Sequence, residues 1–130
     1  MRKYYIFIIR QEFYENYKNN PLYLYKTLEK LYSLKISDFG YGISIYNQLC
    51  LIFNTEVLNN YFLRKFNNYK YNKHFIKSEH TIIEINKTCI VLLTKYNIPK
   101  VMKNLLYCNK NLFVCDFENR DYFWLQEQYI

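Results

Sequence analysis

The hydrophobic pattern changes its period within the first residues of the chain. Residues 4–9 are apolar or aromatic without interruption and rich in residues that favour strands. A run of this length is too short for an ordinary helix and predicts a strand buried on both faces. In residues 11–18 polar side chains separate the aromatic ones, and Phe13 and Tyr17 are four apart. This spacing places both rings on one face of a predicted helix.

The pair formed by Phe13 and Tyr17 has two interpretations. In one, the pair belongs to the hydrophobic core, which is the usual fate of aromatic residues at helical spacing. In the other, the predicted strand fixes the helix and the helix presents the pair to a partner. The spacing alone leaves both open.

A second helix is predicted after Asn20, which can cap it, with Pro21 at its first position. Leucines at 24, 28 and 31 give this helix an apolar face to about Ser33. Residues 35–47 contain both glycines of the chain and suggest a loop followed by a short element. Residues 49–53 are apolar throughout and read equally as a strand or a buried helical turn.

Thr55 can cap the next predicted helix, whose aromatic face extends from residue 58 to Tyr69. Residues 70–78 have mixed polarity and suggest a second, weaker helix. The segments 81–86 and 88–95 are β-branched and apolar, and a tight turn at Asn86-Lys87 would join them in a hairpin. Pro99 opens a helix that ends near Asn109. Residues 112–117 and 122–125 predict two further strands around a polar turn, and residues 126–130 form a tail.

These elements predict an α/β (α+β) fold in a single domain, residues 1–130. A mixed or antiparallel sheet of about five strands would carry helices on one or both faces. The length of 130 residues suits one domain with a substantial core, and no repeat or linker divides the chain.

Composition adds an excess of aromatic and basic residues. The chain has 16 Tyr and 10 Phe, no Ala, and only 2 Gly and 2 Pro, as AT-rich codon usage produces. The net charge of +7 is carried by scattered lysines, and the densest basic stretch is 64–77. Solvated lysines explain most of this charge. The alternative is a small basic nucleic-acid-binding domain that would use Lys65, Tyr69, Lys70, Tyr71, Lys73 and Lys77.

The four cysteines lack metal-binding or redox spacing, and no signal peptide or 18-residue apolar span is present. We therefore expect a cytoplasmic protein without membrane attachment, whose reduced cysteines pack as small hydrophobic residues. Pairing of the four thiols in an exported protein is the alternative.

Candidate chemistry is sparse. His74 and His80 lack metal-ligand spacing, and no nucleophile elbow or glycine-rich phosphate loop occurs. Asp116 lies in an apolar strand, where a carboxylate needs a structural partner or a strand-end position. An enzyme built around Asp116 and His80 is supported by residue identity alone. The sequence therefore favours a binding module over an enzyme, without metal, cofactor or small-molecule substrate.

Two stretches together resemble a known family. The opening YYIFIIRQEFYENY has paired tyrosines, an apolar strand, and an acidic residue and Phe with a Tyr four further on. The ending LFVCDFENRDYFWL has an apolar strand with DF, a polar turn and an aromatic-Trp-Leu strand. Both are similar to the corresponding parts of the SirA family, the sporulation inhibitors of replication of endospore-forming Firmicutes. The resemblance covers roughly the first 30 and last 50 residues and is loose over 35–78.

The resemblance implies a cytoplasmic, non-enzymatic inhibitor of replication initiation. Its partner would be the N-terminal domain of the initiator DnaA, bound during sporulation, with no direct contact to nucleic acid. Phe13 and Tyr17 match the family's aromatic contacts on the first helix, and Tyr14 and Lys18 would flank them. Tyr46 and Gln48 are the expected second contact segment.

Overall fold

The computed structural model describes residues 1–33, 39–67 and 69–129. Its strands join into one antiparallel sheet in the order β3-β4-β5-β6-β1-β7-β8, with β2 paired to β1 outside this path. The strands are β1 (Arg2–Ile9), β2 (Cys50–Leu51), β3 (Tyr69–Lys70), β4 (Lys73–Ile76), β5 (Thr81–Ile85), β6 (Ile90–Thr94), β7 (Leu112–Asp116) and β8 (Asp121–Trp124). The α+β class and the five expected strands are confirmed. The expected number of about five strands was too low, because the middle of the chain adds β2, β3 and β4.

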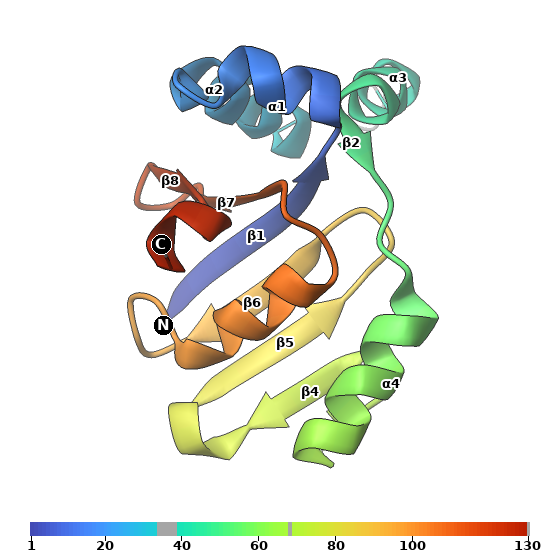
Figure 1. Cartoon of the computed structure of the whole chain (residues 1–130), viewed down its shortest axis with the longest axis vertical. Coiled ribbons are helices and arrows are strands. Elements are labelled where there is room, and N and C mark those ends of the chain that lie inside the picture. Colours follow the sequence, from blue (N-terminus) through green and yellow to red (C-terminus); the bar gives the residue numbers. More distant parts are fainter. Residues whose placement is uncertain (34–38, 68, 130) are drawn as a thin grey trace.

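The helices lie in two groups (Figure 1). The helices α1 (Gln11–Tyr17), α2 (Pro21–Tyr32) and α3 (Phe39–Leu49) gather at one end of the molecule, and α4 (Thr55–Phe66) lies alongside β4 and β5. Three 3-10 helices, η2 (Lys77–Glu79), η3 (Lys100–Tyr107) and η4 (Leu125–Tyr129), complete the described elements. None of the described helices is both long and apolar enough to cross a bilayer.

The sheet separates two hydrophobic clusters. In β1, Tyr4, Ile6 and Ile8 point to the face covered by α4, η3 and η4. Phe7 points to the opposite face, where α1–α3 pack against β7 and β8. All of β7 is buried, because helices cover both of its faces.

The first two helices follow the sequence closely. Gln11–Tyr17 is helical as expected, and Pro21 opens α2, which ends at Tyr32. Asn20 occupies the N-cap position, but its side chain makes no capping hydrogen bond. The leucine face of α2 is confirmed in part, since Leu24 and Leu28 are buried and Leu31 is only partly so.

The middle of the chain corrects several expectations. Residues 39–49 form the helix α3, where a loop followed by a short element was expected, and residues 35–38 of the expected loop lie outside the described residues. Asn54 caps α4 in place of Thr55, because its side-chain oxygen accepts from the backbone nitrogen of Val57. The helix ends at Phe66 with Asn67 in the left-handed conformation, φ 49°. Tyr69 is therefore not on its face.

The segment expected as a weak helix forms strands instead. Residues 69–76 make the β3–β4 hairpin, and β4 pairs with β5. Alternation explains the change, because His74 and Ile76 are buried whereas their neighbours are not. The expectation of a helix was wrong because burial in this segment alternates every two residues, as in a strand, and does not follow the 3.6-residue period of a helix.

The C-terminal third is largely as predicted. The hairpin of β5 and β6 is confirmed, although its connection runs over residues 86–89 and Asn86 does not adopt a positive φ. The helix after Pro99 is a 3-10 helix ending at Tyr107, and the expected tail is η4. All four cysteines are free thiols. Cys50 and Cys115 are buried as expected, but Cys108 is exposed.

Candidate functional site: an aromatic groove between three helices

The aromatic pair of α1 lies at the edge of the core. The rings of Phe13 and Tyr17 are parallel, with an interplanar angle of 2° and 6.3 Å between centroids. Both side chains are half-buried, and α1 contributes no fully buried residue. Phe13 packs at the margin of the cluster beneath α1–α3. The interpretation of this pair as core residues is therefore wrong for Tyr17 and only marginally right for Phe13.

The pair forms one wall of a small groove between α1, α2 and α3. The cavity is about 100 Å³ and also contacts Tyr23 and Thr27 of α2 and Gln48 of α3. Tyr23 is 61% exposed and Gln48 is exposed, so the rim is open to a partner. Three of the six predicted site residues, Phe13, Tyr17 and Gln48, thus meet in one place.

The two flanking residues of α1 have different environments. Tyr14 packs edge-on against buried Trp124, with 4.9 Å between ring centroids, and so holds α1 on β8. Lys18 is exposed and forms an ion pair with Glu15 at 3.2 Å. Of these two, Lys18 is available to a partner at the end of the groove, whereas Tyr14 mainly anchors the helix.

Tyr46 lies on another side of α3. Its hydroxyl donates to the backbone oxygen of Thr88 at 2.7 Å and also lies 3.2 Å from that of Leu51. Burial raises the pKa of this hydroxyl. The expected grouping of Tyr46 with Gln48 is not seen, because residues two apart on a helix point in nearly opposite directions. Tyr46 instead lines an apolar pocket of about 360 Å³ with Tyr5, Phe7 and Tyr32.

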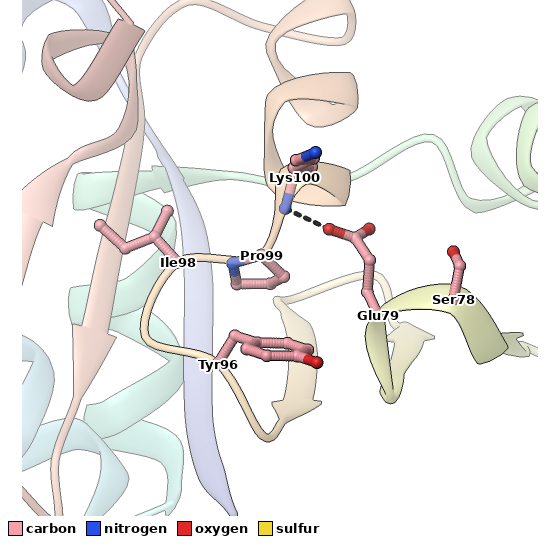
Figure 2. Close-up of a pocket in the computed structure, with 6 residues that line it drawn as sticks. All are labelled: Ser78, Glu79, Tyr96, Ile98, Pro99 and Lys100. Atoms are coloured by element: carbon pink, nitrogen blue, oxygen red, sulfur yellow. Dashed lines mark hydrogen bonds between the residues drawn. The ribbon is translucent and has the colours of Figure 1, made fainter.

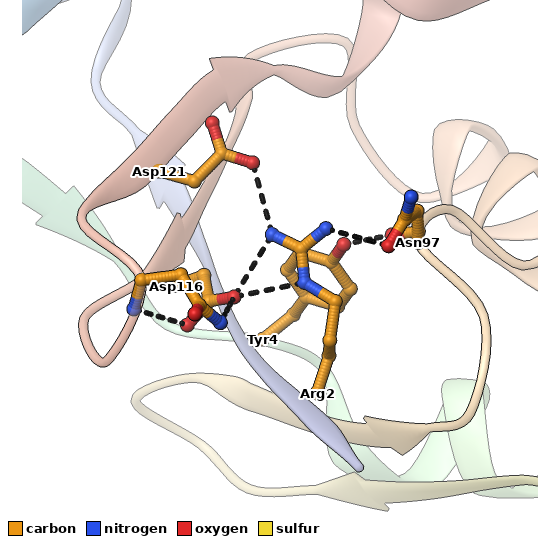
Figure 3. Close-up of polar contacts among 6 residues, drawn as sticks. Arg2, Tyr4, Asn97, Asp116 and Asp121 are labelled. Atoms are coloured by element: carbon orange, nitrogen blue, oxygen red, sulfur yellow. Dashed lines mark hydrogen bonds and ion pairs between the residues drawn. The ribbon is translucent and has the colours of Figure 1, made fainter.

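Asp116 has the structural partner that its buried position requires. Its carboxylate, 1% exposed, accepts from Arg2 Nε at 3.0 Å and from the side chain of Asn119 at 2.7 Å (Figure 3). Arg2 also pairs with Asp121 at 3.1 Å. Burial alone would raise the pKa of Asp116, but hydrogen bonds from Asn119 and Arg2 outweigh it and lower the pKa. This network joins β1 to the β7–β8 turn.

The structure does not bring Asp116 together with His80. His80 follows η2 and packs near Tyr96, with 6.3 Å between ring centroids. Two strands, β1 and β6, separate β7 from β5, which begins next to His80. At a spacing of about 4.8 Å per strand, the two side chains lie on the order of 14 Å apart or more. Within the described residues, no group of three His, Cys, Asp or Glu side chains can hold a metal ion.

A second hollow shows a contact that the sequence did not suggest. It measures about 480 Å³ and is lined by Glu79, Tyr96, Ile98 and Pro99, among others. The Glu79 carboxylate accepts from the backbone nitrogens of Lys100 and Val101, as Figure 2 shows for Lys100. Glu79 therefore caps η3 from 21 residues away. A cap so distant in sequence leaves no local signal.

The residues of the nucleic-acid alternative spread over several elements. Lys65 of α4 lies over the ring of Tyr61 at 5.9 Å, and Lys70 faces Lys73 across the β3–β4 hairpin. Tyr71, at the tip of this hairpin, is 85% exposed. Lys77 lies in η2 beyond the other end of β4. Tyr69 is in β3.

The comparisons with known proteins add no assignment. No protein-family model matches the chain, and none of the curated proteins matches it at a significant level.

Proposed function

We propose that the chain is a SirA-like inhibitor of replication initiation that binds the N-terminal domain of DnaA. The observation that carries this proposal is the stacked pair Phe13 and Tyr17, which is only half-buried and shares an open groove with Gln48. These are three of the positions at which the resemblance expects partner contacts. Aromatic side chains contribute large contact area at low entropic cost and often dominate interfaces.

The mechanism would be occlusion. DnaA uses its N-terminal domain for self-association and for recruiting partners that load the helicase. A protein that covers the same patch competes with these partners by mass action. Such inhibition requires neither a catalytic group nor a cofactor, so the proposal includes no enzymatic activity. It also places the protein in the cytoplasm, where DnaA acts.

The groove favours this arrangement because its rim combines rigid and adaptable contacts. The stacking of Phe13 on Tyr17 fixes both rings before a partner arrives, which lowers the ordering cost of binding. Gln48 offers an amide for hydrogen bonds, and Lys18 a positive charge at the end of α1.

Calorimetry with the isolated N-terminal domain of the cognate DnaA tests the proposal. We expect a stoichiometric complex that loses about 1–3 kcal/mol of binding free energy in Phe13→Ala and in Tyr17→Ala. Tyr107→Ala is the matched control, because Tyr107 is 82% exposed on η3, away from the groove. The fluorescence of buried Trp124 reports whether each variant is folded. Absence of binding at high micromolar concentrations with a folded sample would refute the proposal.

A basic nucleic-acid-binding domain is the second candidate, and exposed Tyr71 beside Lys70 and Lys73 favours it. Its affinity for a short single-stranded oligonucleotide would fall steeply with salt, because phosphate neutralisation releases counterions. An aromatic protein interface would respond much less. A steep salt dependence, together with an affinity that Tyr71→Ala lowers at every salt concentration, would support this candidate in place of the DnaA complex.

A further inference from the structure

Half of one sheet face has no covering layer among the described elements. On β4, β5 and β6, the side chains of Phe75, Ile82, Val91 and Leu93 form what we call the open sheet face. The register places Phe75 opposite Ile82, Ile82 opposite Leu93, and Val91 opposite Tyr5 of β1. All four are half-buried and belong to neither hydrophobic cluster.

The reverse side of the same strands is packed. Ile76, Ile83 and Leu92 point the other way and are buried in the cluster that includes α4 and η3. The helices α1–α3 pack over β7 and β8 on the open side, and in Figure 1 they gather at the far end of the sheet from β4 and β5. None of the elements in residues 1–33, 39–67 and 69–129 therefore supplies the layer that an apolar sheet face normally acquires.

The apolar surface continues beyond the open sheet face at both ends. Tyr5 also lines the pocket of about 360 Å³, whose rim carries Tyr32, 57% exposed, and Ile52, 62% exposed. Phe75 and Ile82 line a separate hollow of about 440 Å³, which we call the β4–β5 hollow. Apolar side chains thus follow one another across neighbouring strands between the two hollows, and exposed apolar surface of this kind marks interaction sites.

The charged residues around the open sheet face favour an acidic partner. Lys3 and Lys73 are exposed on strands of this face, and Lys77 and Lys95 line the β4–β5 hollow of about 440 Å³. Glu84, opposite Lys73, is the one acidic residue among the paired positions of the face. A partner with carboxylates around an apolar stripe would complement this rim.

The same observations argue against two other occupants. A second copy of the chain would bring like-charged lysines together, which disfavours self-association. Single-stranded nucleic acid is bound by rows of stacking aromatic rings. The centre of this face is mostly aliphatic, with Ile82, Val91 and Leu93 beside Phe75.

We propose that the open sheet face binds an acidic amphipathic helix of a partner protein. Crossing from β4 to β1 spans about 14 Å at about 4.8 Å per strand, which is the length of a helix of about ten residues. Its apolar stripe would cover the open sheet face while flanking carboxylates meet the lysines. The open sheet face itself shares no residue with the Phe13–Tyr17 groove, so the inference does not depend on DnaA. Tyr46, an expected DnaA contact, lines only the adjoining pocket of about 360 Å³.

The test uses the full chain labelled with ¹⁵N and a designed helical peptide of about 14 residues as probe. The peptide carries leucines at positions three and four apart and glutamates on both flanks, and a second peptide replaces every glutamate with lysine. We expect the acidic peptide to shift amide resonances of β4, β5 and β6, and the basic peptide to bind far more weakly.

Two substitutions locate the site without touching the core. Lys73→Glu should lower the affinity for the acidic peptide by about fivefold, as expected for reversal of a rim charge. Leu93→Asp should reduce binding further, and the dispersion of the spectrum shows whether this variant is folded. Lys103→Glu is the matched control, because it makes the same charge change at an exposed position on η3. It should leave the affinity unchanged.

Several results would overturn the proposal. These are shifts confined to α1–α3, equal binding of both peptides, no shift up to millimolar peptide, and equal weakening by Lys73→Glu and Lys103→Glu. Shifts of the same amides caused by an oligothymidylate but not by the peptide would assign the face to nucleic acid. Shifts of these amides that depend on protein concentration, with no peptide added, would assign the open sheet face to a second copy of the chain.

Discussion

Removal of Arg2 tests the polar network that joins the N-terminal strand to the C-terminal hairpin. The guanidinium contacts Asp116 at 2.9 Å, Asp121 at 3.1 Å and the side-chain oxygen of Asn97 at 3.0 Å. These contacts connect residues about a hundred positions apart and close the β1–β7 side of the sheet (Figure 3). We expect Arg2→Met to keep the aliphatic packing of the side chain and to remove its charge.

The magnitude follows from what the substitution leaves behind. Asp116 is 1% exposed and would keep hydrogen bonds from Asn119 alone. Loss of one partner of a buried ion pair costs about 3–5 kcal/mol. Arg2 is 24% exposed, so solvent screens part of its contribution and the expected loss is about 2–3 kcal/mol. Against a total stability on the order of 5–15 kcal/mol, this loss is easily measured.

Urea unfolding followed by Trp124 fluorescence measures the effect, because Trp124 is 1% exposed in the folded state. Arg64→Met removes an exposed arginine from α4 and should change the free energy of unfolding by less than about 0.5 kcal/mol. Asp116→Asn in the Arg2→Met background should restore part of the loss, since the buried charge is then absent. An Arg2→Met effect no larger than that of Arg64→Met would refute the reasoning.

The pH dependence of the same pair has a definite sign. The pKa of Asp116 is lowered in the folded protein, where hydrogen bonds from Asn119 and Arg2 outweigh the effect of burial. Its contribution is therefore present above the ordinary aspartate pKa of about 3.9 and is lost as the pH falls below that value. Asp116→Asn should flatten the stability profile in this acidic range.

Three further predictions concern single side chains. His74 is buried 2.8 Å from Asn59 and burial lowers its pKa, so stability should fall as the pH drops below about 6.5, and His74→Gln should remove this slope in urea unfolding at pH 5–7. Glu79→Ala removes the cap of η3 and should cost about 1–2 kcal/mol, whereas an unchanged melting temperature would show that η3 needs no cap. Asn54→Ala should cost about 1 kcal/mol, while Asn54→Asp, which keeps the accepting oxygen, should not.

Local pattern predicted the elements that have a clear helical period or a continuous apolar run. The helix from Pro21 has the period, the strand at 4–9 and the hairpin of β5 and β6 have the apolar runs, and the structure contains each. The short strands of the middle failed this test, because β3 has two residues and β4 four. Two glycines suggested a loop where α3 forms, because packing against α2 and β2 outweighs their low helix propensity.

The candidate site was predictable only where it depends on one helix. The spacing of four correctly placed Phe13 and Tyr17 on one face, because no tertiary information is needed for that inference. Gln48 reaches the groove only because α3 packs beside α1 and α2, which one helix alone does not reveal. Tyr46, two residues earlier on α3, points away from the groove to Thr88. The expectation of a partner for Asp116 was sound, but its identity as Arg2 depends on β1 pairing with β7.

The open sheet face shows why a hydrophobic pattern can predict a strand and still misjudge its surroundings. Ile82 and Ile83 are adjacent and lie on opposite faces of β5, so the pattern identifies the strand without telling which of its faces the chain itself covers. The chain supplies a cover for Ile83 and none of the described elements covers Ile82. An apolar position on an incompletely covered sheet therefore carries information about a partner. That information emerges only when the packing of every other layer is known, because sequence alone does not separate a face buried within the chain from one buried in a complex.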